Sequence, residues 1–186
     1  MARASRGRSA WLRPTLVAAI TLAAAAPGRT AQAPSVPIQQ DKGSGLEVRF
    51  ISFPWRPDVF QGFEGGSPAA RSWAFARLVV SSYFALDEVR LNPGQYALVL
   101  NPKTGPLPMT LELRRIDNRE FLVDPPGMAA PPAGETVYKR PVTFGPGAEP
   151  APALDLSVAS WNEGSLLTIR YGDRKLVKQL PRVNPY

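Results

Sequence analysis

The sequence predicts an all-β protein, an antiparallel β-sandwich of about nine short strands. Apolar and polar residues alternate along several short runs, which is the pattern of strands that bury one face of a sheet. The 186 residues include 21 prolines and 15 glycines, which interrupt helices and supply turns. No run of helical periodicity is long enough for a core helix.

The chain begins with the pattern of a secretory signal peptide. Four arginines among the first 13 residues precede an apolar run, Leu16–Ala26, and the triplet Ala31-Gln32-Ala33 follows. The apolar run is shorter than the roughly 20 residues of a membrane span. We expect residues 1–33 to be removed on export, which leaves no transmembrane span and a periplasmic or extracellular protein. Because Pro34 is unfavourable directly after a cleavage point, cleavage after Ala25 is the alternative.

The net charge of +7 belongs mostly to this leading segment. Five of the 22 basic residues precede Pro34 and none of the 15 acids does, so the remaining chain carries +2. A nearly neutral domain has no electrostatic basis for binding nucleic acid, and none is expected as a partner. The chain has no cysteine, so packing alone must hold the fold.

The remaining residues divide into a lead, one domain and a tail. Residues 34–45 are rich in Pro, Gly and polar residues and predict a flexible lead. The sandwich domain is expected over 46–182, and residues 183–186 form the tail. The period-two runs of this domain are Leu46–Phe50, Met109–Arg114, Leu154–Val158 and Leu167–Tyr171.

Turn residues separate these strands. Asn92-Pro93-Gly94-Gln95 predicts a type II turn between the runs 88–91 and 96–100. Two-residue hairpin turns are predicted at Asp117-Asn118 and Gly172-Asp173, and a longer hairpin loop at Asn162-Glu163-Gly164. The Pro/Gly-rich stretches predict exposed loops at 101–108, 124–135 and 145–153.

The segment 67–84 fits two kinds of structure. Ser67-Pro68 is typical of a helix start, with Ser as the N-cap and Pro in the first turn. Leu78–Phe84 is rich in Val, Tyr and Phe, which favour strands. We predict a short helix or turn near 68–75, followed by a strand.

The composition excludes several kinds of catalytic site. The chain has no histidine, which removes Ser-His-Asp triads and the usual zinc and haem sites. Asp41–Gly45 lacks the repeated acidic ligands of a calcium loop. A hydrolase would need two acids that face each other across a cleft, and the spacing of the acids does not show such a pair. The acids in or near predicted loops are Asp58, Glu64, Asp87, Glu88, Asp124 and Glu163.

Aromatic residues gather between positions 53 and 75. Phe53, Trp55, Phe60, Phe63, Trp73 and Phe75 could form a platform for a sugar or peptide, or a hydrophobic cluster under a long loop. Packing is favoured because large aromatic side chains are mostly buried. The possible ligand-binding residues are Trp55, Phe60, Phe63 and Trp73.

The segment Leu91-Asn-Pro-Gly-Gln-Tyr96-Ala-Leu-Val-Leu100 resembles the Gly-x-Tyr hairpin of exported, immunoglobulin-like β-sandwich domains of bacteria. In one such family, of unknown function, a segment with Trp and a strand precede the hairpin, as Trp73 and Leu78–Phe84 do here. That family also closes on a strand pair similar to Leu166–Tyr171 and Leu176–Leu180. The stretch Trp73–Arg77 lacks the Gly-Ala-Asn-like residues of that family, and the resemblance implies no activity.

Together these observations predict a non-catalytic binding or structural accessory domain of the bacterial cell envelope, without cofactor or metal. The expected partner is an envelope protein or a glycan. One alternative is a carbohydrate-binding module that uses exposed aromatic residues. The other is a hydrolase that depends on paired carboxylates.

Overall fold

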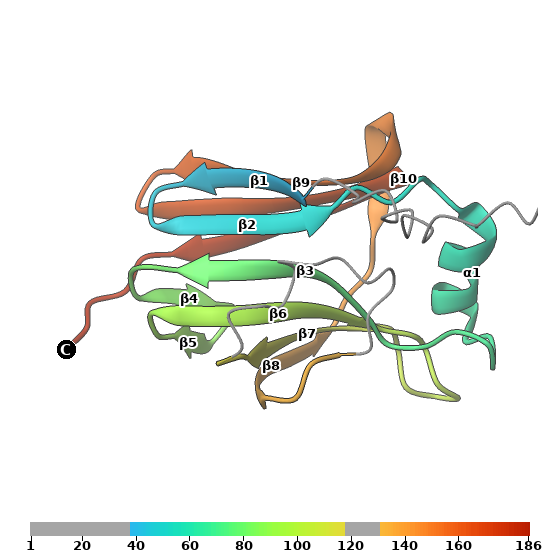
Figure 1. Cartoon of the computed structure of the whole chain (residues 1–186), viewed down its shortest axis with the longest axis horizontal. Helices are drawn as coiled ribbons and strands as arrows, with labels where there is room; N and C mark the ends of the chain where they lie inside the picture. Colours follow the sequence, from blue (N-terminus) through green and yellow to red (C-terminus); the bar gives the residue numbers. More distant parts are fainter. Residues whose placement is uncertain (1–37, 118–130) are drawn as a thin grey trace, which may run out of the picture. The chain divides into compact units, whose positions relative to one another are not determined.

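The computed structural model describes residues 38–117 and 131–186, and within these ranges the chain forms ten strands and one helix (Figure 1). The predicted all-β, antiparallel class is confirmed. The chain separates into two units at the Ala33–Pro34 junction, and every described residue belongs to the second unit. No helix in the described ranges is long and apolar enough to cross a membrane. Three sequence predictions fall wholly or partly outside these ranges. They are the signal peptide, the turn at Asp117-Asn118, of which only Asp117 is described, and the part of the 124–135 loop before residue 131.

Six strands form one antiparallel sheet. In spatial order they are β1 (Ile38–Gly43), β2 (Leu46–Ile51), β3 (Trp73–Val80), β6 (Gly94–Asn101), β7 (Thr110–Arg115) and β8 (Glu135–Pro141). The predicted alternation is confirmed in β2, where Leu46, Val48 and Phe50 are buried. Such alternation gives the sheet one face that packs into the core.

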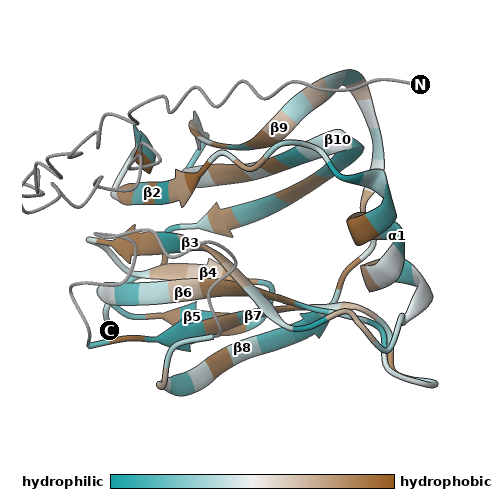
Figure 2. Ribbon diagram, turned by 45° about the vertical axis from the view of Figure 1, so that its right-hand side comes forward, coloured by the Kyte–Doolittle hydropathy of each residue, from teal (hydrophilic) through white to brown (hydrophobic). Residues whose placement is uncertain are grey.

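The remaining strands are β4 (Phe84–Leu86), β5 (Val89–Leu91), β9 (Gly145–Trp161) and β10 (Gly164–Pro181), and they form the second layer. β9 pairs with β10 and β4 pairs with β5, and a bridge between Phe84 and Arg182 links the two pairs. Hydrophobic and hydrophilic residues alternate along the strands of both layers (Figure 2). Leu154, Leu156 and Leu167 are buried in the common core.

β10 contains a reversal of the chain at Gly172-Asp173, as predicted. The amide of Arg182 donates to the carbonyl of Glu163 at 3.0 Å. A Cβ atom on Gly164 would stand 2.2 Å from the carbonyl oxygen of Leu180. The two halves of β10 therefore lie side by side. Gly172 has φ +61°, which matches the first turn position of a type II′ hairpin.

The connection from β5 to β6 carries the chain from one layer to the other. Gly94 has φ +159°, far from the roughly +80° of a type II turn, so the predicted type II turn is not formed. A type II turn would reverse the chain within one sheet, whereas β5 and β6 belong to different sheets. The buried Tyr96 hydroxyl donates to the carbonyl of Asn92 at 2.6 Å. A bond from a tyrosine hydroxyl to a carbonyl a few residues upstream resembles the tyrosine corner described for some β-sandwiches.

The helix α1 (Pro57–Gly65) was not predicted. Pro57 occupies the first turn, Asp58 favours the helix N-terminus, and Gly66 ends the helix at φ +75°. No helix forms at 68–75, where the amide of Ala70 donates to Ser67 O at 2.9 Å and closes a turn. The predicted turn is therefore confirmed there, and β3 already begins at Trp73.

Two segments predicted to lack regular structure form strands. Residues 38–43 of the expected lead form β1, although its side chains are mostly polar. Pairing with β2 holds it, and the Asp41 carboxylate accepts a hydrogen bond from the Val158 amide of β9 at 2.7 Å. Residues 145–153, expected as a loop, belong to β9 and pair irregularly with the second half of β10. Proline is tolerated in an irregularly paired edge segment, where a missing N–H group disrupts the sheet least.

Candidate binding groove

The aromatic residues singled out in the sequence form one cluster between α1, β3 and β10. Phe60, Phe63 and Trp73 are only 2–4% exposed, so the interpretation as core packing is confirmed for these three. Trp55 is partly buried and lies 5.6 Å from Phe60, measured between ring centroids. Tyr171 joins the cluster at 5.8 Å from Trp73, a contact that the sequence did not indicate.

Trp55 packs directly on the reversal of β10. Its ring makes an edge contact with Tyr171 at 4.6 Å, and the Tyr171 hydroxyl donates to Pro54 O at 2.8 Å. A Cβ atom on Gly172 would stand 2.1 Å from the Trp55 ring. Glycine is therefore needed at this position both for its positive φ and for the close approach of the indole.

A groove of about 840 Å³ opens beside α1. One wall is the helix, and the other is the segment that runs from the Ser67 turn to the start of β3. Apolar side chains make up most of its surface. Its described lining residues are Asp58, Val59, Gly62, Phe63, Ser67, Ala69, Ala70, Arg71, Ser72, Trp73 and Pro131. Two of the four predicted ligand-binding residues, Phe63 and Trp73, thus form part of this groove, whereas Trp55 and Phe60 are not among its lining residues.

Backbone contacts with the loop after β6 fix the position of the helix wall. The amide of Lys103 donates to Phe63 O at 2.9 Å. Gly66 lies so close to this loop that a Cβ atom would stand 2.9 Å from the Lys103 carbonyl oxygen. These contacts join the end of α1 to the loop that follows β6 of the six-stranded sheet. The groove is therefore built on the packed core.

Most polar groups of the groove already have partners. Asp58 forms an ion pair with Arg56 at 2.8 Å, and hydrogen bonding from Arg56 holds the pKa of Asp58 below its ordinary value. The Ser72 hydroxyl donates to Asn101 Oδ1 at 2.6 Å. The guanidinium of Arg71 donates to the carbonyls of two residues in the adjacent turn, Pro68 and Ala70.

The predicted acids are distributed over separate places. Asp58 lies in the groove, and it is the one acid among the described lining residues. Glu64 forms an ion pair with Arg174 at 3.2 Å. Glu88 and Glu163 are exposed in turns, and Asp124 lies outside the described residues. The described part of the chain contains no group of three or more acids that could hold a metal ion.

The sixth acid, Asp87, lies in the turn between β4 and β5 and contacts two other strands. Tyr138 of β8 donates its hydroxyl to Asp87 Oδ2 at 2.6 Å, and Lys178 of β10 donates at 3.2 Å. Burial by itself raises the pKa of Asp87, but the hydrogen bonds from Tyr138 and Lys178 outweigh it and leave the pKa lowered. Burial and the bond to Asp87 raise the pKa of Tyr138. This cluster joins β8, β10 and the turn between β4 and β5, and we interpret it as a structural contact.

Glu112 of β7 is a charged residue in the predicted period-two run, yet it is only 1% exposed. Its carboxylate accepts hydrogen bonds from Arg114 at 2.5 Å, Thr136 at 2.7 Å and Asn101 at 2.9 Å. Burial raises the pKa of Glu112, but these bonds outweigh it and the pKa is lowered. The alternation alone could not reveal this network, because its members come from three strands.

No protein-family model, curated protein or solved structure matches the chain.

Proposed function

We propose that this chain is an exported, non-catalytic binding or accessory domain of the bacterial cell envelope, whose ligand occupies the groove beside α1. The groove carries the proposal. Its volume of about 840 Å³ falls within the roughly 300–1,000 Å³ of ligand sites. A mostly apolar surface with a few placed polar groups is the usual composition of such sites.

Export is supported by the order of basic, apolar and small residues before Pro34. An immunoglobulin-like, exported type is supported by the contact of Tyr96 with Asn92, which resembles a tyrosine corner. The proposed location is the periplasm or the cell exterior.

Binding without catalysis is supported by the chemistry of the lining. Asp58 is neutralised by Arg56, and the described lining offers no second carboxylate for acid–base catalysis. Three of the aromatic residues considered for sugar binding, Phe60, Phe63 and Trp73, are only 2–4% exposed. Such buried rings offer little face for a sugar to stack on, so we do not advance the carbohydrate-binding alternative.

The test compares the exported protein with the variant Ala69→Trp, which places an indole in the groove at an exposed position. Fractions of an envelope extract are screened for those that raise the melting temperature. We expect at least one fraction to stabilise the wild type and the control Ala159→Trp, whose site is an exposed alanine of β9. The same fraction should not stabilise Ala69→Trp. If every active fraction stabilises all three proteins equally, the groove is not the binding site.

Export is tested separately by mass spectrometry of the protein recovered from the envelope. The expected N-terminus follows Ala33 or Ala25. An intact Met1 on the exported chain would contradict removal of the leading segment.

A further inference from the structure

Arg71 is the charged residue of the groove that remains able to bind a ligand. It is exposed, it lines the groove, and it takes part in none of the ion pairs among the described residues. Two carbonyl oxygens, of Pro68 and Ala70, hold its Nη1. A guanidinium has five N–H donors, so this anchoring leaves donors for a ligand while it restricts the side chain.

The other charge of the lining has a partner of its own. Asp58 is paired with Arg56 through two hydrogen bonds, at 2.8 and 3.1 Å. The described lining therefore presents a positive charge at Arg71 and a compensated carboxylate at Asp58. An anionic group of a ligand would find its complement at Arg71, where planar, charge-assisted hydrogen bonds to a carboxylate are favourable.

The rest of the groove favours hydrocarbon. Val59, Phe63, Ala69, Ala70, Trp73 and Pro131 line it with carbon surface. The hydroxyl of Ser72 is engaged by Asn101, and the Ser67 hydroxyl accepts from the Ala69 amide at 3.3 Å. A ligand rich in hydroxyl groups would lose water there and find few free partners, which costs free energy. A hydrocarbon chain would gain from the same desolvation.

We infer that the groove binds an aliphatic monocarboxylate, with the hydrocarbon chain on the apolar surface and the carboxylate on Arg71. The inference rests on the proposed function, because it names the ligand class of the same groove. It goes further by assigning the head group of the ligand to one residue. Charge complementarity at Arg71 and the engagement of the Ser67 and Ser72 hydroxyls are the two observations that carry it. The indole Nε1 of Trp73 has no hydrogen-bond partner among the described residues, but it is buried below the surface of the groove.

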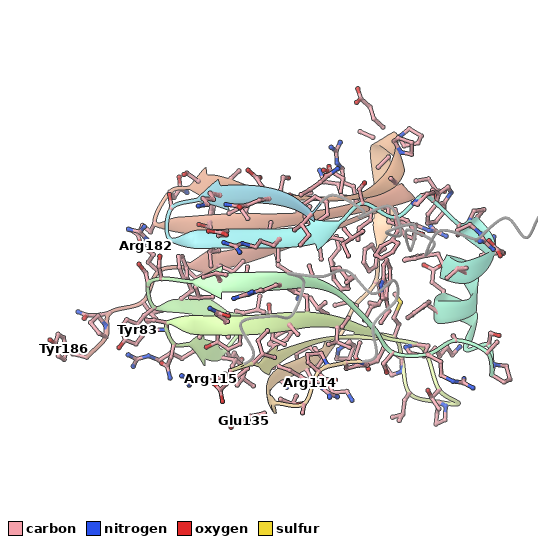
Figure 3. All side chains as sticks on the ribbon, viewed as in Figure 1. Tyr83, Arg114, Arg115, Glu135, Arg182 and Tyr186 are labelled. Atoms are coloured by element: carbon pink, nitrogen blue, oxygen red, sulfur yellow. The ribbon has the colours of Figure 1, made fainter. Side chains whose placement is uncertain are left out.

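The experiment measures binding of octanoate, decanoate, dodecanoate and neutral dodecanol to the exported protein by titration calorimetry, below the micelle concentrations. Arg71→Gln is compared with Arg115→Gln, which removes an exposed arginine at the end of β7. Figure 3 shows Arg115 at the part of the domain remote from α1. Ala69→Trp serves as the variant with a filled groove, and melting temperatures confirm that each variant is folded.

We expect affinity to rise about tenfold for every two methylene groups, since burial of each contributes about 0.8 kcal/mol. Arg71→Gln should weaken dodecanoate about tenfold and leave dodecanol unchanged, because only the carboxylate uses the guanidinium. Arg115→Gln should bind both ligands as the wild type does. Equal binding of dodecanoate and dodecanol, with no effect of Arg71→Gln, would overturn the inference.

Two further results separate the inference from the proposed function. Ala69→Trp should abolish binding of every chain length; if it does not, the groove is not the site and both proposals fail. A short apolar peptide with a free C-terminal carboxylate forms the last arm. If this peptide binds in an Arg71-dependent manner while the aliphatic acids do not, the aliphatic ligand class is wrong and groove binding survives.

Discussion

Substitution of Gly172 by alanine should destabilise the fold through two separate effects. Gly172 stands at the reversal of β10 with φ +61°, a conformation that alanine adopts only with strain. The added Cβ atom would also stand 2.1 Å from Cε2 and 2.2 Å from Cδ2 of the Trp55 ring. Carbon atoms in contact are about 3.5–4.0 Å apart, so the ring or the turn must move.

The two effects have comparable magnitudes. An L-residue held in a sparsely populated backbone region costs about 1–3 kcal/mol. Forcing additional carbon into a packed site costs about 1–3 kcal/mol. Trp55 is only partly buried, so its ring can shift and relieve part of the overlap. We therefore expect Gly172→Ala to lower the free energy of unfolding by about 3 kcal/mol.

Urea unfolding followed by circular dichroism measures this loss, and a double-mutant cycle separates its parts. In the Trp55→Ala background the overlap is gone, so Gly172→Ala should cost only the backbone part, about 1–2 kcal/mol. Gly145→Ala is the matched control, because a Cβ atom there has its nearest contact at 4.0 Å. A loss for Gly172→Ala that is the same with and without the Trp55 ring would refute the packing of Trp55 on the reversal.

Three other carboxylates give testable predictions. Glu112→Gln leaves Arg114 without its buried counter-charge and should cost about 2 kcal/mol in urea unfolding; a neutral effect would contradict the network. Asp41→Ala removes the acceptor of the Val158 amide and should cost about 1 kcal/mol, with faster hydrogen exchange at that amide, whereas unchanged exchange would argue against the contact. Asp87→Asn should cost about 1 kcal/mol at neutral pH, a modest value because the carboxyl is partly exposed. Folding lowers the pKa of Asp87, so the difference in unfolding free energy between the wild type and Asp87→Asn should be full above the ordinary pKa of 3.8. It should be lost as the pH falls through the lowered pKa of the folded state. A difference that persists in acid would refute the role of the charge.

The sequence predicts those strands that one face of the core specifies. The period-two runs at 46–50, 154–158 and 167–171 became strands with the expected residues buried, because burial of alternate side chains determines both the structure and the pattern. Strands held mainly by pairing leave a weaker pattern. β1 has polar side chains and is held by β2 and by a carboxylate, and residues 145–153 contain prolines at an edge of the sheet.

The helix and the groove are harder to predict for different reasons. α1 has nine residues with two buried aromatic side chains, so its apolar pattern is too short to distinguish from a loop. Its capping signals, Pro57 and Gly66, are local and could have identified it. The groove depends on residues from 58–63, on 67–73 and on Pro131, which meet only in the folded chain. The aromatic cluster at 53–75 overlaps the groove only at Phe63 and Trp73.

The aromatic cluster determines how this site must be tested. Phe63 and Trp73 line the groove, but they also belong to the core, where Trp73 contacts Tyr171 of β10. Truncation of a buried aromatic residue costs about 3–5 kcal/mol, so either substitution would reduce binding through loss of the fold alone. Ala69 and Arg71 are exposed in the segment between the Ser67 turn and β3, and neither belongs to the core cluster. A loss of binding at these two positions, with unchanged melting temperature, therefore separates ligand recognition from stability.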